Sequence, residues 1–408
     1  HFIADGRDTP PKKAGEFVKQ LEAAFKKFGV GKIATMIGRY FAMDRDKNWD
    51  RTQKAIDLFT KNLGTHYRSP AEAVRGNYRF QKTDEFLEPS VIGDGGRVQD
   101  KDVIIFFNYR NDRARQLLAP FDQYQRKIDV KLQNYTRPRD IYVCTLTQYY
   151  SDTNIPVVAV PSPAESKNPL GEVVASAGLP QFHCAETEKF AHVTYFFNSG
   201  RDAIFPGEKD EIVPSKKIAT YDQAPAMSAQ DVTEKVLSAI SSQYPFIVVN
   251  YANGDMVGHT GVWEAVIKAC STVDECLGRV LPAASSAGYK AILIADHGNC
   301  EVMVDEKTGE PHKEHTINPV PFVYFDFIAR SYDFKQGNAE ATKSRYVEFA
   351  NRPPIGVLAD VAPSVLALLG LKKPEDMGGM DIIKSLDTKS QGGVLASSDT
   401  EQPPPIIS

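Results

Sequence analysis

An apolar run followed at once by an Asp–His pair constrains this chain more than any other stretch. Residues 245–251, PFIVVNY, have the unbroken apolar character of a buried strand in a parallel sheet. The next residues, NGDMVGHTG, place Asp255 and His259 four positions apart among glycines, and an amphipathic helical pattern follows. Sites in open α/β sheets form where the carboxyl end of a strand meets a helix. The stretch therefore predicts an α/β fold with a site at this edge.

A second strand pattern, KAILIA, ends in Asp296 and His297, and His315 follows in the loop HKEHTINP. Imidazole and carboxylate together suit Zn²⁺ or Mn²⁺, and no cysteine is placed as a soft ligand. Two such ions about 3.5–4 Å apart can clamp the two oxygens of a phosphoryl transfer. Either motif alone is commonly a helix cap and a turn. Both together, with a further histidine, favour a metal site.

Strand and helix patterns alternate through both halves of the chain, which predicts a parallel sheet. One early helix should bury a face made of Phe17, Leu21, Phe25 and Phe28 and end at Gly29. At 408 residues the chain is long enough for two domains, and the stretch NIPVVAVPSPAESK marks their boundary. We predict a substrate-clamping domain at 1–156, a linker at 157–167, a metal-binding domain at 168–385 and a loose tail at 386–408.

Three turns of the first half present arginine after a predicted strand. Parallel strands would bring these turns to one edge, where guanidinium groups could grip a small, multiply anionic ligand. The alternative is a solvated face on which neighbouring aspartates neutralise each arginine; three turns in series favour the ligand. Lys189 lies in an apolar neighbourhood and could neutralise a phosphate, or pair with Glu186 or Glu188. The residues of the three turns are Arg7 with Asp8, Arg39 with Arg45, and Arg110 with Arg113.

Composition excludes several classes of function. The net charge of -4 gives no sign of a nucleic-acid or anionic-membrane partner. No apolar run approaches the roughly 20 residues of a membrane span. The five cysteines fit no zinc spacing, which favours free thiols in a reducing compartment.

Taken together, the motifs resemble a known family. DGRDTPP, GRYFAMDRDKNW, FFNYRNDRAR, QFHCAETEKFAHVTYFFN, NGDMVGHTG, ADHGN and HTINPVP occur in that order. They are similar to the motifs of cofactor-independent phosphoglycerate mutase, of the alkaline phosphatase superfamily, over nearly the whole chain. The resemblance implies an alkaline-phosphatase-like parallel-sheet metal domain and a smaller α/β phosphotransferase domain, with the active site between them.

The resemblance also implies a function and residue roles. The activity would be an isomerase reaction, the metal-dependent interconversion of 3-phosphoglycerate and 2-phosphoglycerate without 2,3-bisphosphoglycerate, in a cytoplasmic monomer. Two divalent ions, Mn²⁺ or else Zn²⁺, Co²⁺ or Mg²⁺, would bind. Asp255, His259 and His315 would hold one ion, and Asp296 and His297 would belong to the other. Lys189 would lie beside the transferring phosphoryl group. Substrate would be gripped by Arg7, Asp8, Arg39, Arg45, Arg110 and Arg113.

One departure from the family concerns the nucleophile. The family's phosphate-accepting serine, an aspartate ligand of the second ion and a GGVHSH-type motif lie in an amino-terminal segment that this sequence does not contain. We therefore expect the natural protein to begin earlier and the chain alone to be inactive. Two alternatives stay open: a metal-dependent phosphatase or sulfatase of the same superfamily, and a non-catalytic fragment that binds metal and phosphoglycerate.

Overall fold

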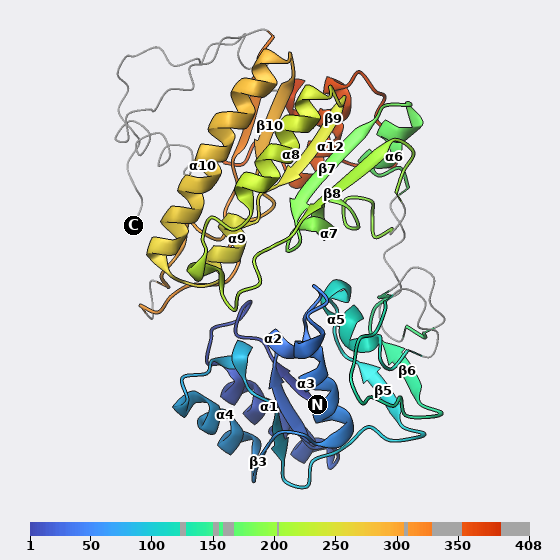
Figure 1. The fold of residues 1–408 in the computed structure, drawn as a ribbon, viewed down its shortest axis with the longest axis vertical. Coiled ribbons are helices and arrows are strands. Elements are labelled where there is room, and N and C mark those ends of the chain that lie inside the picture. Colours follow the sequence, from blue (N-terminus) through green and yellow to red (C-terminus); the bar gives the residue numbers. More distant parts are fainter. Residues whose placement is uncertain are drawn as a thin grey trace.

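The computed structural model describes residues 1–122, 128–149, 155–157, 167–201, 204–305, 309–328 and 353–384. Within these ranges the chain has an amino-terminal half, the lower part of Figure 1, and a carboxyl-terminal half above it. Most of the predicted linker and the whole predicted tail lie outside the described residues. No helix in the described part of the chain is long and apolar enough to cross a bilayer.

The amino-terminal half contains two sheets. The larger has the strand order β1-β2-β4-β3, and β5 pairs with β6 in a second, two-stranded parallel sheet. The strands are β1 (Phe2–Ala4), β2 (Thr35–Gly38), β3 (Thr65–Tyr67), β4 (Ser90–Ile92), β5 (Val103–Phe106) and β6 (Tyr142–Thr145). The helices are α1 (Ala14–Phe28), α2 (Arg39–Ala42), α3 (Trp49–Lys61), α4 (Pro70–Arg79) and α5 (Asn111–Leu118), with a 3₁₀ turn η1 (Asp84–Phe86).

The carboxyl-terminal half also contains two sheets. Strand β7 lies between β8 and β9, all parallel, and β10 pairs with β11. The strands are β7 (Gln181–Glu186), β8 (Glu208–Val213), β9 (Phe246–Asn250), β10 (Lys290–Ile294) and β11 (Phe322–Asp326). The helices are α6 (Leu170–Ser176), α7 (Phe190–Val193), α8 (Ala229–Ser241), α9 (Asn253–Gly258), α10 (Trp263–Ser286) and α12 (Val361–Leu368), with 3₁₀ turns η2 (Tyr221–Gln223) and η3 (Leu358–Asp360).

The α/β fold class with parallel sheets is confirmed, although two strand pairs depart from the parallel pattern. Strands β2 and β4 run antiparallel, and so do β10 and β11. The described residues between β10 and β11 form no helix, so no crossover helix among them sets the direction of β11. Strand β9 is parallel as expected, yet its residues are half-buried, not fully covered. The hydrophobic pattern of a sequence predicts where strands and helices lie, but not whether two neighbouring strands run parallel or antiparallel.

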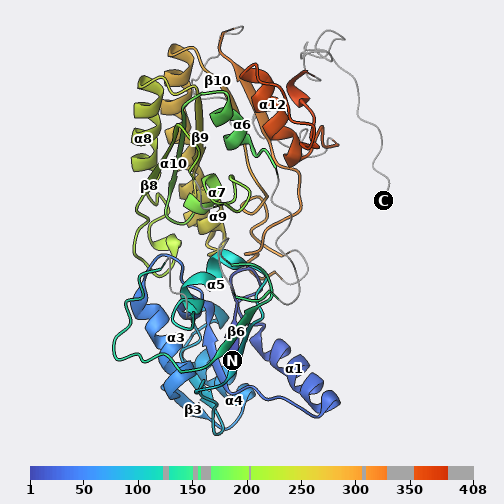
Figure 2. The ribbon, with the colours of Figure 1, turned by 90° about the vertical axis from the view of Figure 1, so that its right-hand side faces the viewer.

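Helix α1 shows the same limit on a smaller scale. It ends as predicted at Gly29, whose φ of 69° is the left-handed conformation that glycine adopts without strain. Its buried side chains, however, are Ala14 and Val18, whereas Phe17 and Phe28 are exposed. Figure 2 shows α1 on the outer side of its half. The predicted apolar face is therefore wrong for Phe17, Leu21 and Phe28, whereas Phe25 packs against the core as expected.

Candidate active site

The carboxyl end of β9 positions the first two functional side chains. The chain turns directly into α9, which carries Asp255 in its first turn, and His259 follows the last turn as the carboxyl cap. Residues four apart lie on the same face of a helix, so the two side chains meet. Asp255 Oδ1 lies 3.0 Å from His259 Nε2. The spacing read from the sequence thus becomes a pair of ligand atoms at one edge of the sheet.

His315 reaches the same pair from the loop between β10 and β11. Its Nε2 lies 2.9 Å from Asp255 Oδ1 and 3.2 Å from His259 Nε2. His259 Nδ1 lies 2.7 Å from the carbonyl oxygen of Lys313, which can only accept, so this nitrogen carries the proton. The Nε2 lone pair of His259 therefore points at the other two ligand atoms, as in metal-binding histidines.

These three atoms fit a divalent ion. Atoms bound to one tetrahedral ion at about 2.0–2.1 Å lie about 3.3 Å apart, close to the spacings seen. Asp255 and His315 also group with His297, whose ring stacks on that of His315 with the centroids 3.7 Å apart. Asp296 pairs with His297 at 3.6 Å. The donor set of imidazoles and carboxylates thus suits metal, and His315 stands between the two groups of ligands.

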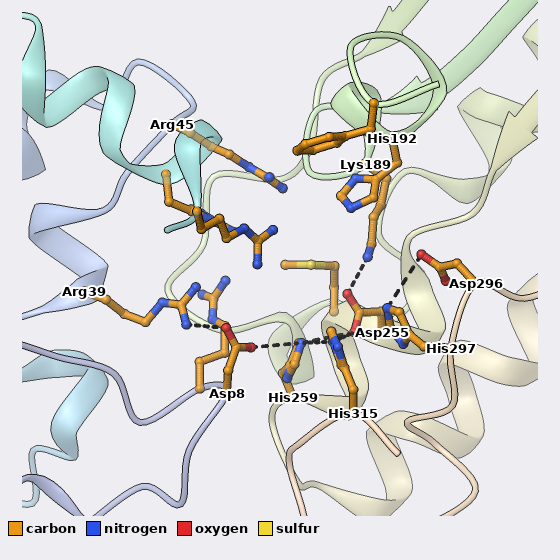
Figure 3. Close-up of a pocket in the computed structure, with 15 residues that line it drawn as sticks. Asp8, Arg39, Arg45, Lys189, His192, Asp255, His259, Asp296, His297 and His315 are labelled. Carbon is orange, nitrogen blue, oxygen red and sulfur yellow. Dashed lines mark hydrogen bonds and ion pairs between the residues drawn. The ribbon is translucent and has the colours of Figure 1, made fainter. Parts of the chain in front are cut away.

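The arginine turns face this cluster from the amino-terminal half (Figure 3). Arg39 Nη1 lies 2.7 Å from both Asp5 Oδ1 and Asp8 Oδ2. Burial opposes ionisation of Asp8, but the Arg39 guanidinium outweighs it and lowers the pKa of Asp8 to about 2. Arg7 pairs with Glu85 at 2.6 Å. The expectation of neutralising neighbours holds for several arginines, yet Arg39 is buried and not on a solvated face.

The turns converge for a different reason from the one predicted. Strands β1 and β2 are parallel neighbours, but β5 belongs to another sheet. Arg110 and Arg113 therefore reach the pocket from the start of α5, beside a separate sheet edge. Convergence comes from the packing of two sheets and not from one common edge.

Glu188 joins the two halves and was not among the predicted site residues. It follows β7, and its Oε2 lies 3.3 Å from Arg45 Nη2 and 3.5 Å from Arg113 Nη2. Burial acts to raise the pKa of Glu188, but Arg113 and Arg45 outweigh it and lower the pKa to about 2. The position of Glu188 next to Lys189 in the sequence could have suggested a role in the site. Its arginine partners, however, lie too far away in the sequence for a local pattern to predict them.

Lys189 pairs with neither glutamate proposed from the sequence. Its Nζ lies 2.5 Å from Asp255 Oδ2, so the lysine charge faces the metal-binding cluster. Asn299 also reaches Asp255, with its Nδ2 3.3 Å from Oδ1. His192, which the sequence left open between packing and ligand contact, lines the pocket, and burial followed by the nearby Lys189 lowers its pKa to about 4.

Arg113 lies in a crowded group of positive charges at the pocket. Its side chain is buried, and its Nε has no hydrogen-bond partner among the described residues. Burial, and then the adjacent Arg45, lower the pKa of Arg113 to about 9. A buried donor without a partner costs free energy, and crowded guanidinium charges repel one another. A phosphate or carboxylate in the pocket would offset the crowded guanidinium charges.

All twelve residues predicted for the site line one pocket, together with three others. Ten of the side chains are labelled in Figure 3. The roles given to the individual residues stay predictions. The pocket is lined by Arg7, Asp8, Arg39, Arg45, Arg110, Arg113, Lys189, His192, Phe196, Asp255, Met256, His259, Asp296, His297 and His315.

Comparison with known proteins now identifies the family. Residues 21–373 match the model of the Metalloenzyme superfamily. The chain is 46% identical over 391 residues to the 2,3-bisphosphoglycerate-independent phosphoglycerate mutase of Symbiobacterium thermophilum, covering 94% of this chain and 70% of that protein. This chain belongs to the family of 2,3-bisphosphoglycerate-independent phosphoglycerate mutases, within the Metalloenzyme superfamily. As a member of the metalloenzyme superfamily with ligand clusters in its pocket, it binds divalent metal.

Two further members support the assignment. The mutase of Rippkaea orientalis is 44% identical over 392 residues, which covers 95% of this chain and 69% of that protein. A crystal structure of Leishmania mexicana phosphoglycerate mutase at low cobalt concentration superposes with a TM-score of 0.77 at 27% identity, covering 92% of this chain and 70% of that one. The mutase-family likeness therefore extends through both halves.

Proposed function

We propose that this chain belongs to an enzyme that interconverts 3-phosphoglycerate and 2-phosphoglycerate by metal-dependent phosphoryl transfer. One observation carries the proposal. A pocket joins an arginine cluster from one half of the chain to a cluster of histidines and carboxylates from the other. The first cluster suits a small ligand with a carboxylate and a phosphate, and the second suits the transfer of phosphoryl groups. The relatives named above are mutases of this substrate.

We assign two divalent ions to the histidine side of the pocket. Asp255, His259 and His315 would hold one, and Asp296 and His297 would contribute to the second. Mn²⁺ is our first choice, with Zn²⁺, Co²⁺ or Mg²⁺ as alternatives and no requirement for 2,3-bisphosphoglycerate. Such ions supply Lewis-acid neutralisation of phosphoryl oxygens.

The chain's own side chains would bind and orient the substrate. Arg113 would donate from its guanidinium group to an oxygen of phosphoglycerate, and the other arginines would complete the grip. Asp8 would hold Arg39 in place through Oδ2, while its Oδ1, 3.7 Å from His259 Nε2, faces the metal-binding cluster. Lys189 would place a positive charge beside the transferred group and so stabilise charge that grows during transfer.

The phosphoryl acceptor is a separate question. None of the side chains that line the pocket in the described part of the chain carries an aliphatic hydroxyl or a thiol. We therefore infer that none of these lining residues is the serine that accepts the phosphoryl group. Our proposal remains a phosphoserine intermediate on a serine outside the printed sequence. The domain limits given from the sequence, a cytoplasmic location and a monomeric state are parts of the same proposal.

A turnover assay separates this proposal from its two alternatives. The product of the complete reading frame and the 408-residue chain would each be incubated with 3-phosphoglycerate and Mn²⁺, without bisphosphoglycerate, with and without EDTA. Phosphorus NMR follows 2-phosphoglycerate and free phosphate together. We expect EDTA-sensitive isomerisation that far exceeds phosphate release. Phosphate release alone would identify a phosphatase, and binding without turnover by both proteins would identify a binding module.

A calorimetric titration tests the arginine grip. Hydrogen bonds to charged groups contribute about 1.5–3 kcal/mol, so Arg113→Ala should weaken 3-phosphoglycerate binding roughly ten- to a hundredfold. Arg279→Ala is the matched control. Arg279 of α10 pairs with Glu234 of α8 on the protein surface, and neither residue lines the pocket. Equal dissociation constants for the two variants would count against the grip.

Metal content tests the histidine assignment. His259→Ala removes one of three converging ligand atoms, and we expect the bound Mn²⁺ per chain to fall while the fold persists. His66→Ala, at an exposed position of β3, should retain the wild-type content. Unchanged metal in His259→Ala would remove that residue from the ligand set.

A further inference from the structure

A second group of metal-ligand side chains lies outside the pocket, between β7 and β8. His183 on β7 stands directly opposite Asp210 on β8 in the parallel register. Glu208, two residues before Asp210, points to the same face of the sheet because side chains alternate along a strand. The side chains of His183 and Glu208 are fully buried, and that of Asp210 is 14% exposed. Figure 1 shows the two strands side by side in the carboxyl-terminal half.

Hydrogen bonds fix the tautomer of His183. Gln181 Nε2 donates to the carbonyl oxygen of Gly171 at 2.8 Å, which turns Gln181 Oε1 toward the histidine. His183 Nε2 lies 3.1 Å from that oxygen and must therefore carry the proton. Nδ1 is then left with a lone pair.

This lone pair points at two carboxylates. His183 Nδ1 lies 3.5 Å from Glu208 Oε1 and 3.7 Å from Asp210 Oδ1. Neither Nδ1 nor Asp210 Oδ1 has a hydrogen-bond partner among the described residues, although both atoms are buried. Three acceptors that face one another in a dry interior are costly unless a proton or a cation lies between them.

The distances from His183 Nδ1 to the two carboxylates fit a shared cation better than a proton held between the histidine and a carboxylate. A charge-assisted N–H···O bond is about 2.7–2.9 Å long, well short of the separations seen. Ligand atoms of a tetrahedral Zn²⁺ ion lie about 3.3 Å apart, given bonds of about 2.0–2.1 Å. Glu208 is also braced as an outer shell requires: Asn198 Nδ2 donates to its Oε1 and the Phe205 amide to its Oε2, both at 2.9 Å.

We propose that His183, Glu208 and Asp210 bind one divalent transition-metal ion, best matched by Zn²⁺, at a structural site separate from the catalytic pocket. One imidazole and two carboxylates suit this class of ion, and the two negative charges balance its own. The partly exposed Asp210 gives an entry path and room for a water ligand. The ion links β8 to β7, the strand that ends just before Glu188 and Lys189, and so stabilises the position of these two residues.

Counting ions in a variant with a disabled pocket tests this site. The double variant His259→Ala/His297→Ala of the full chain would be equilibrated with Zn²⁺, dialysed and analysed by elemental mass spectrometry. We expect one retained Zn²⁺ per chain. Adding Asp210→Asn, which keeps the shape, should remove it, whereas adding Glu211→Gln on the opposite face of β8 should not. No retained ion in the double variant overturns the proposal, whatever the further variants do.

Thermal unfolding and cobalt spectroscopy give independent readouts. Zn²⁺ should raise the melting temperature of the double variant, and this shift should vanish with Asp210→Asn and persist with Glu211→Gln. Co²⁺ in place of Zn²⁺ should give the strong visible absorption of a four-coordinate site. An ion that survives Asp210→Asn with an unchanged melting shift would place the metal elsewhere and refute the assignment.

Discussion

Replacing Glu188 by glutamine should destabilise the fold strongly, because this carboxylate is the buried counter-charge of two arginines from the other half of the chain. It lies 3.3 Å from Arg45 and 3.5 Å from Arg113, and all three side chains are 9% exposed. At an effective dielectric constant of about 20, each contact is worth about 5 kcal/mol before desolvation is counted. Removing one partner of a buried ion pair costs about 3–5 kcal/mol, because the other charges stay buried without compensation.

A matched control exists on β8. Glu211 lies 3.3 Å from Lys209 and 3.5 Å from Lys235, which are the same distances, but its side chain is 27% exposed and the lysines are about half exposed. Exposed pairs contribute about 0–1 kcal/mol. Urea unfolding followed by circular dichroism should therefore show a loss of about 3–5 kcal/mol for Glu188→Gln and under about 1 kcal/mol for Glu211→Gln. Equal losses would refute the assignment of the effect to burial.

Acid titration adds a second check on the same pair. The folded pKa of Glu188, about 2, lies below the ordinary value of a glutamate, so its stabilising contribution is complete above about pH 5. It is lost as the pH falls toward about 2. The difference in unfolding free energy between wild type and Glu188→Gln should shrink as the pH falls below about 5. A difference that grows in acid would contradict the depressed pKa.

Two further changes test local geometry by thermal unfolding. A Cβ at Gly258 would meet Asn299 Oδ1 at 2.0 Å, so Gly258→Ala should lower the free energy of unfolding by about 1–3 kcal/mol and weaken metal binding through the displaced Asn299. The control is Gly278→Ala in α10. Open space surrounds Gly278, so this change should raise the free energy of unfolding by up to about 1 kcal/mol. Ser69 Oγ accepts from the Glu72 amide at 3.2 Å at the start of α4, so Ser69→Ala should cost about 1 kcal/mol, and an unchanged melting temperature would remove the cap.

The sequence predicted the local elements and the strand ends that carry the site. The run QFHCAE is β7 to the residue, and the strand after Tyr244 leads into α9 with Asp255 and His259 one turn apart. These features follow from periodicities of 2 and 3.6 residues, which local sequence encodes. The long motifs also indicated the family, and the resemblance to that family predicted the set of residues that line one pocket.

Only the tertiary structure decided which charges meet. Lys189 faces Asp255, 66 residues away, and Glu188 faces Arg45, 143 residues away. The direction of β4 and β11, the covered face of α1 and the meeting of His183 with Asp210 were decided in the same way. The physical reason is that local periodicity fixes the backbone of each element, whereas ion pairs, tautomers and burial depend on neighbours brought together by packing across the whole chain.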